Sequence, residues 1–205
     1  MADPDYIKGT FSVDPASFVD DDGEAYLFFG GLWGGQLQCY QQDDGDTFDP
    51  QWLGPKERSG ASDVAQGPRV AKLDSSMRAL ASPTREVNIL NPDTGAPIAA
   101  DDHDKRFFEA AWVHKHQDTY SLSYSTGDSH LLVYATASNP LGPYTYRGRL
   151  LEPVLGWTTR HSVVMFEDRW WLFYHDCELS NGVNHLRSVK VKEIKYRDDG
   201  SIVSA

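Results

Sequence analysis

The sequence has few of the features that mark several large classes of protein. Its 205 residues include two cysteines, Cys39 and Cys177, which are too few for a disulfide framework and are not spaced like the ligands of a zinc site. No apolar run approaches the length of about 18 residues that would predict a membrane span. Met1 opens no charged-then-apolar leader. We therefore predict buried thiols, no membrane partner and a cytoplasmic location.

Basic residues are also scarce. The chain has 19 Lys and Arg against 30 Asp and Glu, which gives a formal net charge of −11, and no basic stripe is present. Binding to phosphate backbones depends on clustered Lys and Arg, so a nucleic-acid partner is excluded. The acidity itself is explained by solubility or by adaptation of the source to salt.

Long helical patterns are absent, and Gly and Pro separate short strand-like stretches, which predicts a single all-β domain over residues 1–205. Three segments share one layout, in which an acidic residue or a histidine precedes a strand, a polar turn follows, and the next strand is rich in aromatic residues. These hairpins begin at Val13–Val19, Phe107–Val113 and Arg160–Phe166.

The repeated hairpins indicate a β-propeller, because a propeller directs the starts of its strands toward one axis. Further strands are expected at His130–Ala135 with Tyr144–Arg147, and at Leu186–Val191 with Ile194–Tyr196. Four strands make one blade, so we expect about three blades, over residues 11–80, 105–150 and 158–203. Three blades leave strand edges open, which predicts either a homo-oligomer or a longer protein.

Two carboxylates in equivalent positions of this repeat, Asp14 and Glu109, are candidates for hydrolysis of a glycosidic bond. Glu109 is the better general acid, because its neighbours Phe108 and Ala110 are apolar and apolar surroundings raise the pKa of a carboxyl group. The alternatives are a solvated strand-edge residue for Glu109 and a turn-forming Asp-Pro pair for Asp14.

Aromatic and basic residues near these strand starts are candidates for sugar binding. Trp33 and Trp157 lie in glycine-containing or loop segments and could stack on a sugar ring, and Phe108 adjoins the acid. Arg187 is expected to bind sugar hydroxyls or to form a surface salt bridge. His161 is a metal-side group, a substrate-side group or a core histidine.

Four of these segments, in this order, resemble glycoside hydrolase family 43, a family of five-bladed propellers that includes β-xylosidases and α-L-arabinofuranosidases. The resemblance covers nearly the whole chain and is carried by Ser12–Phe28, Phe108–Lys115, His161–Val164 with Trp171–His175, and Arg187–Val189 followed by Asp198–Ile202. It implies that Glu109 is the general acid and Asp14 the second carboxylate, which tunes the acid and orients the substrate. It also implies that His161 lies near an axial ion, calcium held largely through waters, and that Arg187 faces the sugar.

The same resemblance implies inversion of the anomeric configuration, which requires a third carboxylate as the general base. In the family that base lies in the first blade, whereas this chain is expected to begin at the third, and neither Asp3 nor Asp5 is assigned to the role. We therefore expect a glycosidase acting on xylo- or arabino-oligosaccharides, with activity weakened by the missing base. The alternatives are a non-catalytic carbohydrate-binding propeller fragment and a structural fragment that is stable only as an oligomer.

Overall fold

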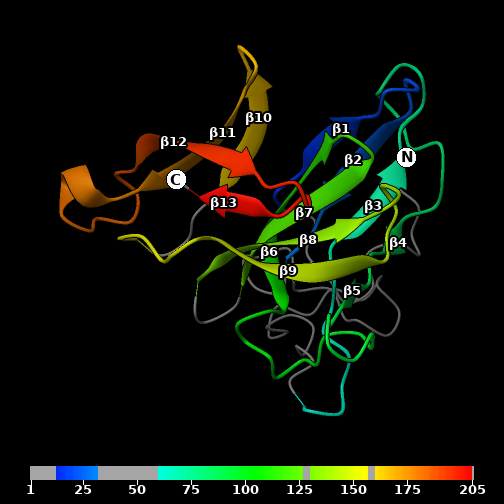
Figure 1. Ribbon diagram of the computed structural model, residues 1–205, viewed down its shortest axis with the longest axis horizontal. Helices are drawn as coiled ribbons and strands as arrows, with labels where there is room; N and C mark the ends of the chain where they lie inside the picture. Colours follow the sequence, from blue (N-terminus) through cyan, green and yellow to red (C-terminus); the bar gives the residue numbers. More distant parts are fainter. Residues whose placement is uncertain (1–12, 32–59, 127–129, 157–159, 205) are drawn as a thin grey trace, which may run out of the picture.

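The computed structural model describes residues 13–31, 60–126, 130–156 and 160–204, and these form three sheets (Figure 1). The first sheet has the order β1–β2–β3–β4, with β1 at Ala16–Val19, β2 at Ala25–Phe29, β3 at Arg69–Lys72 and β4 at Arg85–Glu86. The second has the order β5–β9–β8–β7–β6, with β5 at Ile89–Leu90, β6 at Phe107–His116, β7 at Thr119–Thr126, β8 at Leu132–Ala137 and β9 at Tyr144–Leu151. The third has the order β10–β11–β12–β13, with β10 at His161–Phe166, β11 at Arg169–Asp176, β12 at Ser188–Tyr196 and β13 at Ile202–Ser204. The 3-10 turn η2, Glu178–Ser180, lies between β11 and β12.

The three expected hairpins are confirmed, and each turns on residues with left-handed backbone. Between β1 and β2, Gly23 has φ of 84° and its N–H donates to the Asp20 carbonyl at 3.0 Å. Gln117 has φ of 54° between β6 and β7, and Glu167 and Asp168 have φ of 50° and 59° between β10 and β11. Positive φ at these positions reverses the chain tightly and keeps each pair of strands in antiparallel register.

The all-β propeller class is confirmed, but the strands of the third sheet differ from those expected. Leu186–Val191 and Ile194–Tyr196 were expected to be separate strands, whereas Ser188–Tyr196 forms one continuous strand, β12, and the fourth strand is β13. The reason is that neither Lys192 nor Glu193 is a residue that favours a turn. The turn comes later, where the Gly200 N–H donates to the Arg197 carbonyl at 2.9 Å. No helix in the described ranges is long and apolar enough to cross a membrane.

The middle sheet has a fifth strand that the sequence did not indicate. Strand β5 has only two residues and pairs in parallel with β9, through Ile89 opposite Tyr144 and Leu90 opposite Thr145. Two residues are too few to give an alternating pattern. The middle sheet therefore starts before residue 105, and the first sheet extends through β4 past residue 80.

The middle sheet packs against both of the others. One apolar cluster joins the first and middle sheets around Phe28, Val70 and Leu122, and a second joins the middle and third sheets around Leu132 and Leu172. Strand β6 contacts β1 and β2 on one side and β10 on the other. The starts of β1 and β10 lie together, because Arg160 just before β10 hydrogen-bonds to Asp14 just before β1.

Polar contacts also connect neighbouring sheets. The Trp112 indole Nε1–H donates to the Val163 carbonyl at 3.0 Å, which ties β6 to β10. The Tyr120 hydroxyl donates to Asp20 Oδ2 at 2.5 Å, which ties β7 to the turn after β1. Specific hydrogen bonds of this kind fix how the sheets are placed relative to one another, which apolar packing alone does less strictly.

Candidate active site

Gly30 and Gly31, which follow β2, lie between the residue before Asp14 and the segment that carries Glu109. The Val13 carbonyl accepts a hydrogen bond from the Gly30 N–H at 2.9 Å. A Cβ atom added to Gly31 would lie 2.9 Å from Val13 Cγ2 and 3.6 Å from Glu109 Cβ. Only glycine fits without movement between these two segments, so the first and middle sheets approach closely at this point.

An irregularity in β6 sets the position of Glu109. Its pairing with β7 shifts between Phe107 and Glu109 and again between Glu109 and Trp112, and Ala110 has φ of 60°. Bulges of this kind redirect a side chain and often lie next to active sites. Phe108 and Ala110 on either side are buried, whereas Glu109 is only partly buried, so the carboxyl group emerges from an apolar stretch of backbone.

The surroundings of Glu109 suit a general acid. Burial, as the largest cause, and the negative charge of Asp14 raise the pKa of its carboxyl group to about 7, against the opposing positive charges of Arg187 and Arg160. A carboxyl group with this pKa carries a proton near neutral pH and can donate it. The interaction with Asp14 also places the two candidate carboxylates in one site, as the sequence predicted.

Asp14 is held by a residue that the sequence analysis did not assign. Its backbone has φ of 52°, which is unusual for a residue other than glycine. The Arg160 Nη1 group donates to Asp14 Oδ1, and Arg160 Nη2 donates to the Pro15 carbonyl at 2.8 Å. Arg160 directly precedes His161 at a strand start, and that position was the signal that could have identified it.

Arg187 lies close to this group, on the same side of the third sheet. The Arg187 Nη1 atom is 3.4 Å from His175 Nε2. His175 Nε2 also accepts a hydrogen bond from the Arg160 N–H at 3.0 Å. The positive charge of Arg187 acts on Glu109, so Arg187 lies within electrostatic reach of the acid. His175 is a second residue that the sequence analysis did not assign.

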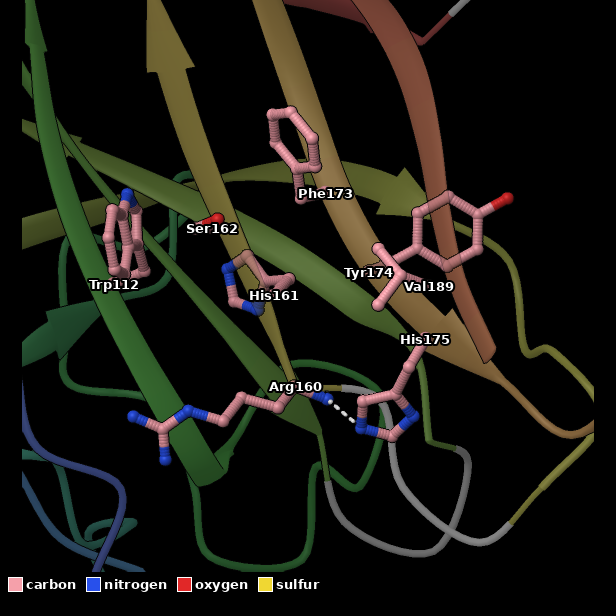
Figure 2. A pocket seen from close by; sticks show the side chains of 8 residues that line it. All are labelled: Trp112, Arg160, His161, Ser162, Phe173, Tyr174, His175 and Val189. Carbon is pink, nitrogen blue, oxygen red and sulfur yellow. Dashed lines mark hydrogen bonds between the residues drawn. The ribbon is translucent and has the colours of Figure 1, made fainter. Parts of the chain in front are cut away.

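A cavity of about 400 Å³ opens beside these residues (Figure 2). One wall is the Trp112 indole from β6, and the rest comes from the third sheet. The side chains that line it are Trp112, Arg160, His161, Ser162, Phe173, Tyr174, His175 and Val189. Apolar rings beside a few directed polar groups are typical of sites that bind small molecules.

His161 is buried, and its hydrogen bonds define which ring nitrogen is free. The Ser123 hydroxyl lies 2.7 Å from His161 Nε2 and 3.4 Å from the Trp112 carbonyl, and it hydrogen-bonds to the imidazole. The Nδ1 atom of His161 is buried with no hydrogen-bond partner. Burial lowers the pKa of His161 to about 3, with smaller contributions from His114 and Arg160, so the ring is neutral.

A neutral imidazole with a free lone pair can accept a bond from a cation or from water. The described residues include no group of three or more His, Cys, Asp or Glu side chains that could hold a metal ion.

The remaining predicted site residues have different outcomes. Phe108 is buried, and its ring meets the His130 ring edge-on at a centroid distance of 6.4 Å. Trp33 and Trp157 lie outside the described residues.

Comparison with known proteins places this site in a family. The family model described as glycosyl hydrolases family 43 matches residues 2–202. Xylosidase/arabinosidase 43A of Humicola insolens is 66% identical over 202 residues, which are 98% of this chain and 62% of that protein. A β-xylosidase of Xylanibacter ruminicola is 47% identical over 201 residues, 98% of this chain and 60% of that protein.

Solved structures give the same result. The GH43_1 enzyme from Xanthomonas citri matches with a TM-score of 0.84 at 51% identity, covering 99% of this chain and 59% of that one. Structures of that enzyme are described as complexed with xylose and with xylotriose. CoXyl43, a β-xylosidase/α-arabinofuranosidase from a compost metagenome, matches with a TM-score of 0.85 at 48% identity, covering 97% of this chain and 59% of that one. Its structure is described as a xylotriose complex in calcium-free form.

The chain thus spans about three fifths of the length of these relatives. Its three sheets form part of the five-bladed propeller that such enzymes share. The family model and the relatives together show that the chain belongs to glycosyl hydrolase family 43.

Proposed function

We propose that this protein is a glycosidase of the β-xylosidase or α-L-arabinofuranosidase type, in which Glu109 is the general acid. The observation that carries the proposal is the Glu109 carboxyl group, whose pKa is raised to about 7 by burial and by Asp14. A protonated Glu109 would donate its proton to the leaving glycosidic oxygen as the bond to the sugar breaks. The same carboxyl group is then left as the carboxylate.

Asp14 and Arg187 support this step in different ways. The negative charge of Asp14 keeps Glu109 protonated before the reaction and would stabilise the positive charge that develops on the sugar ring. Arg187, which lies within electrostatic reach of the acid, would bind sugar hydroxyls. Inversion also needs a base that activates water, and no residue is assigned to that role, so we propose that hydrolysis by this chain is slow.

Xylose- and arabinose-containing oligosaccharides are the substrates we propose. This rests on the names of the relatives and on the xylose and xylotriose complexes described for the Xanthomonas citri enzyme. The cavity beside Arg160 offers apolar ring surface from Trp112 and Phe173, which suits the apolar face of a pyranose.

The decisive experiment replaces the acid. Glu109→Gln keeps the shape of the side chain and removes the proton, so we expect at least about a 10³-fold loss in the hydrolysis of 4-nitrophenyl β-xyloside or α-L-arabinofuranoside. Glu152→Gln, at an exposed pair with Arg149, is the matched control and should leave the rate unchanged. An unchanged rate in Glu109→Gln would remove Glu109 from the mechanism. Binding of xylotriose with no product from the unmodified chain would favour the carbohydrate-binding alternative.

We also propose a calcium ion beside His161, held by Nδ1 and otherwise by water. The support is the buried, unpartnered nitrogen and the description of the CoXyl43 structure as a calcium-free form. When bound, calcium supplies positive charge and ordered water to the site. Titration calorimetry should detect calcium binding in the unmodified protein and not in His161→Phe, and the absence of any binding heat would contradict the proposal.

Self-association is the third part of the proposal. Strands β11 and β12 expose Phe173, Val189 and Val191, with Val189 78% exposed, and Phe173 and Val189 also line the cavity. We call these three residues the outer face of the third sheet. Exposed apolar surface of this kind often marks an interface, and a second copy could cover it. Light scattering on a sizing column should give the mass of a dimer or larger, and a monomer at all concentrations would contradict it.

A further inference from the structure

Arg160 connects the third sheet to the first one at the second carboxylate. Its guanidinium group makes two hydrogen bonds, one to the Asp14 carboxylate and one to the Pro15 carbonyl, the latter at 2.8 Å. The two partners belong to consecutive residues, so one planar group fixes both a side chain and the backbone that carries it. Arg160 and Asp14 are 146 positions apart in the sequence, and no local structure would otherwise hold them together.

Arg160 is itself anchored at its backbone. Its N–H donates to His175 Nε2 at 3.0 Å, a contact drawn in Figure 2. Burial and the nearby Arg187 lower the pKa of His175, which favours the neutral ring that this acceptor role requires. His175 therefore supports both arginines at the mouth of the cavity, through one ring nitrogen.

The backbone conformation of Asp14 indicates why it needs the contact with Arg160. Asp14 has a left-handed backbone, which costs free energy for a residue with a Cβ atom and persists only where the surroundings impose it. The Asp14 side chain is only 25% exposed. Its position relative to Glu109 depends on the group to which its carboxylate bonds. The guanidinium group is the partner that the structure provides.

We propose that Arg160 is a positioning residue, which clamps Asp14 beside Glu109 through its two-point contact and is held in place by His175. This inference rests on the proposed function for its meaning in catalysis, although the clamp itself is a structural statement. Through Arg160 the third sheet would fix a carboxylate that precedes the first sheet, in addition to the sugar contact proposed for Arg187.

The test is a double-mutant cycle read out on Glu109, which requires no hydrolysis. The titration midpoint of the Glu109 carboxyl group is followed by NMR with ¹³C-labelled glutamate, with Glu109→Gln used to assign the signal. Asp14→Asn removes the neighbouring negative charge and should lower the midpoint. With Arg160→Lys, which keeps the charge and loses the fork, or with Arg160→Met, the same Asp14→Asn change should have less than half of that effect.

Arg149→Met provides the matched control, since Arg149 pairs with Glu152 at an exposed position of β9. In that background the effect of Asp14→Asn should be the same as in the unmodified chain. An equal effect of Asp14→Asn with and without Arg160 would overturn the clamp, and so would a midpoint that does not respond to Asp14→Asn at all. If Arg160→Met does not fold, the Arg160→Lys cycle alone decides.

Kinetics give a second readout where hydrolysis is measurable. Arg160→Lys should lower kcat by about tenfold while KM changes less than about twofold, because lysine keeps the positive charge at the cavity wall while the carboxylates are misplaced. A matched rise in KM with an unchanged kcat would assign Arg160 to substrate binding and overturn the positioning role. Loss of activity in Glu109→Gln tests the proposed function separately, so failure of one proposal can be told from failure of the other.

Discussion

The middle sheet and the third sheet bury their residues differently, although both begin with the same kind of hairpin. In the middle sheet, β7 is buried on both faces over seven consecutive residues, from Tyr120 to Thr126. In the third sheet, β11 and β12 alternate, with Leu172 and Ile194 fully buried and Phe173 and Val191 exposed. A sheet with a neighbour on each side has no free face, so the exposed apolar side of the third sheet is a surface without a neighbour in the part of the chain that is described.

The difference in burial between the two sheets also explains which charged groups have a shifted pKa. Glu109 is part of the doubly covered sheet and its carboxyl group is raised in pKa mainly by burial. Arg160 and Arg187 come from the third sheet and remain exposed. The acid thus lies on a buried strand, whereas the two cations that lower its pKa lie at exposed positions just before β10 and β12.

The largest expected effect comes from truncating the apolar residues that the sheets share. Leu122→Ala in the middle sheet and Leu172→Ala on the covered side of the third sheet should each lower the free energy of unfolding by about 3 kcal/mol, because both side chains are fully buried. Val191→Ala, on the outer face of the third sheet, should cost less than about 0.5 kcal/mol. Urea denaturation of the three variants measures the contrast, and an equal cost for all three would remove it.

Glu109→Gln should stabilise the fold in a pH-dependent way. Glu109 has a pKa near 4.5 when unfolded and about 7 when folded, so the folded state binds the extra proton and loses stability as the pH rises from 4.5 through 7. The amide carries no charge, so the variant should be more stable than the parent by about 2 kcal/mol at pH 8 and equal to it at pH 4, after allowance for the partial exposure of the group. Denaturation at the two pH values is the measurement. A constant difference would mean that burial of the carboxylate is not its origin.

Tyr120→Phe should have a smaller effect, at the contact between the first and middle sheets. Burial alone would raise the pKa of Asp20, but hydrogen bonds from Tyr120 and Lys115 outweigh it and lower the pKa. Loss of the 2.5 Å hydrogen bond from the Tyr120 hydroxyl should cost about 1.5 kcal/mol at pH 7. Because the lowered pKa stabilises the fold only above the unfolded value of 3.8, this cost should shrink as the pH falls below that value. Tyr146→Phe is the comparison, because among the described residues the Tyr146 hydroxyl, on the same sheet, has no hydrogen bond to a carboxylate. An equal, pH-independent cost of the two substitutions would contradict the role of Asp20.

The smallest effect on stability is expected for Val189→Asp, on the outer face of the third sheet. Val189 is 78% exposed, so the free energy of unfolding should change by less than about 0.5 kcal/mol. Association should weaken, because a charge placed in an apolar contact must be desolvated. Sedimentation equilibrium should give a higher dissociation constant than for the parent. An unchanged constant would place the interface elsewhere.

The sequence predicted the hairpins well, because their turns carry clear signals. Gly23, Gln117 and Asp168 stand between strands rich in aromatic residues, and the structure places a turn at each. The third and fourth strands were less certain. The two-residue strand β5 gives no pattern, and β12 runs through Lys192 and Glu193, where the sequence predicts a break between two strands.

The site was predicted in part for a similar reason. The repeat and the family resemblance both pointed to Asp14 and Glu109, and the structure brings them together. Arg160 and His175 were not assigned, because their roles depend on contacts between residues 15 to 146 positions apart. The protonated state of Glu109 was expected from its apolar neighbours, but the opposing influence of two arginines depends on packing between sheets that no local pattern records.

The irregular pairing of β6 bears on how such a site can be lost in evolution. Between Phe107 and Trp112 the strand has five steps while its partner β7 has three, from Thr126 to Ser123, so two residues are in excess. One extra residue lies between Phe107 and Glu109 and the other between Glu109 and Trp112, so deletion of one would remove one irregularity and leave the pairing after Trp112 in register. Deletion of two would restore regular pairing with the flanking faces unchanged. A descendant could therefore lose its acid by one short in-frame deletion and keep an intact propeller.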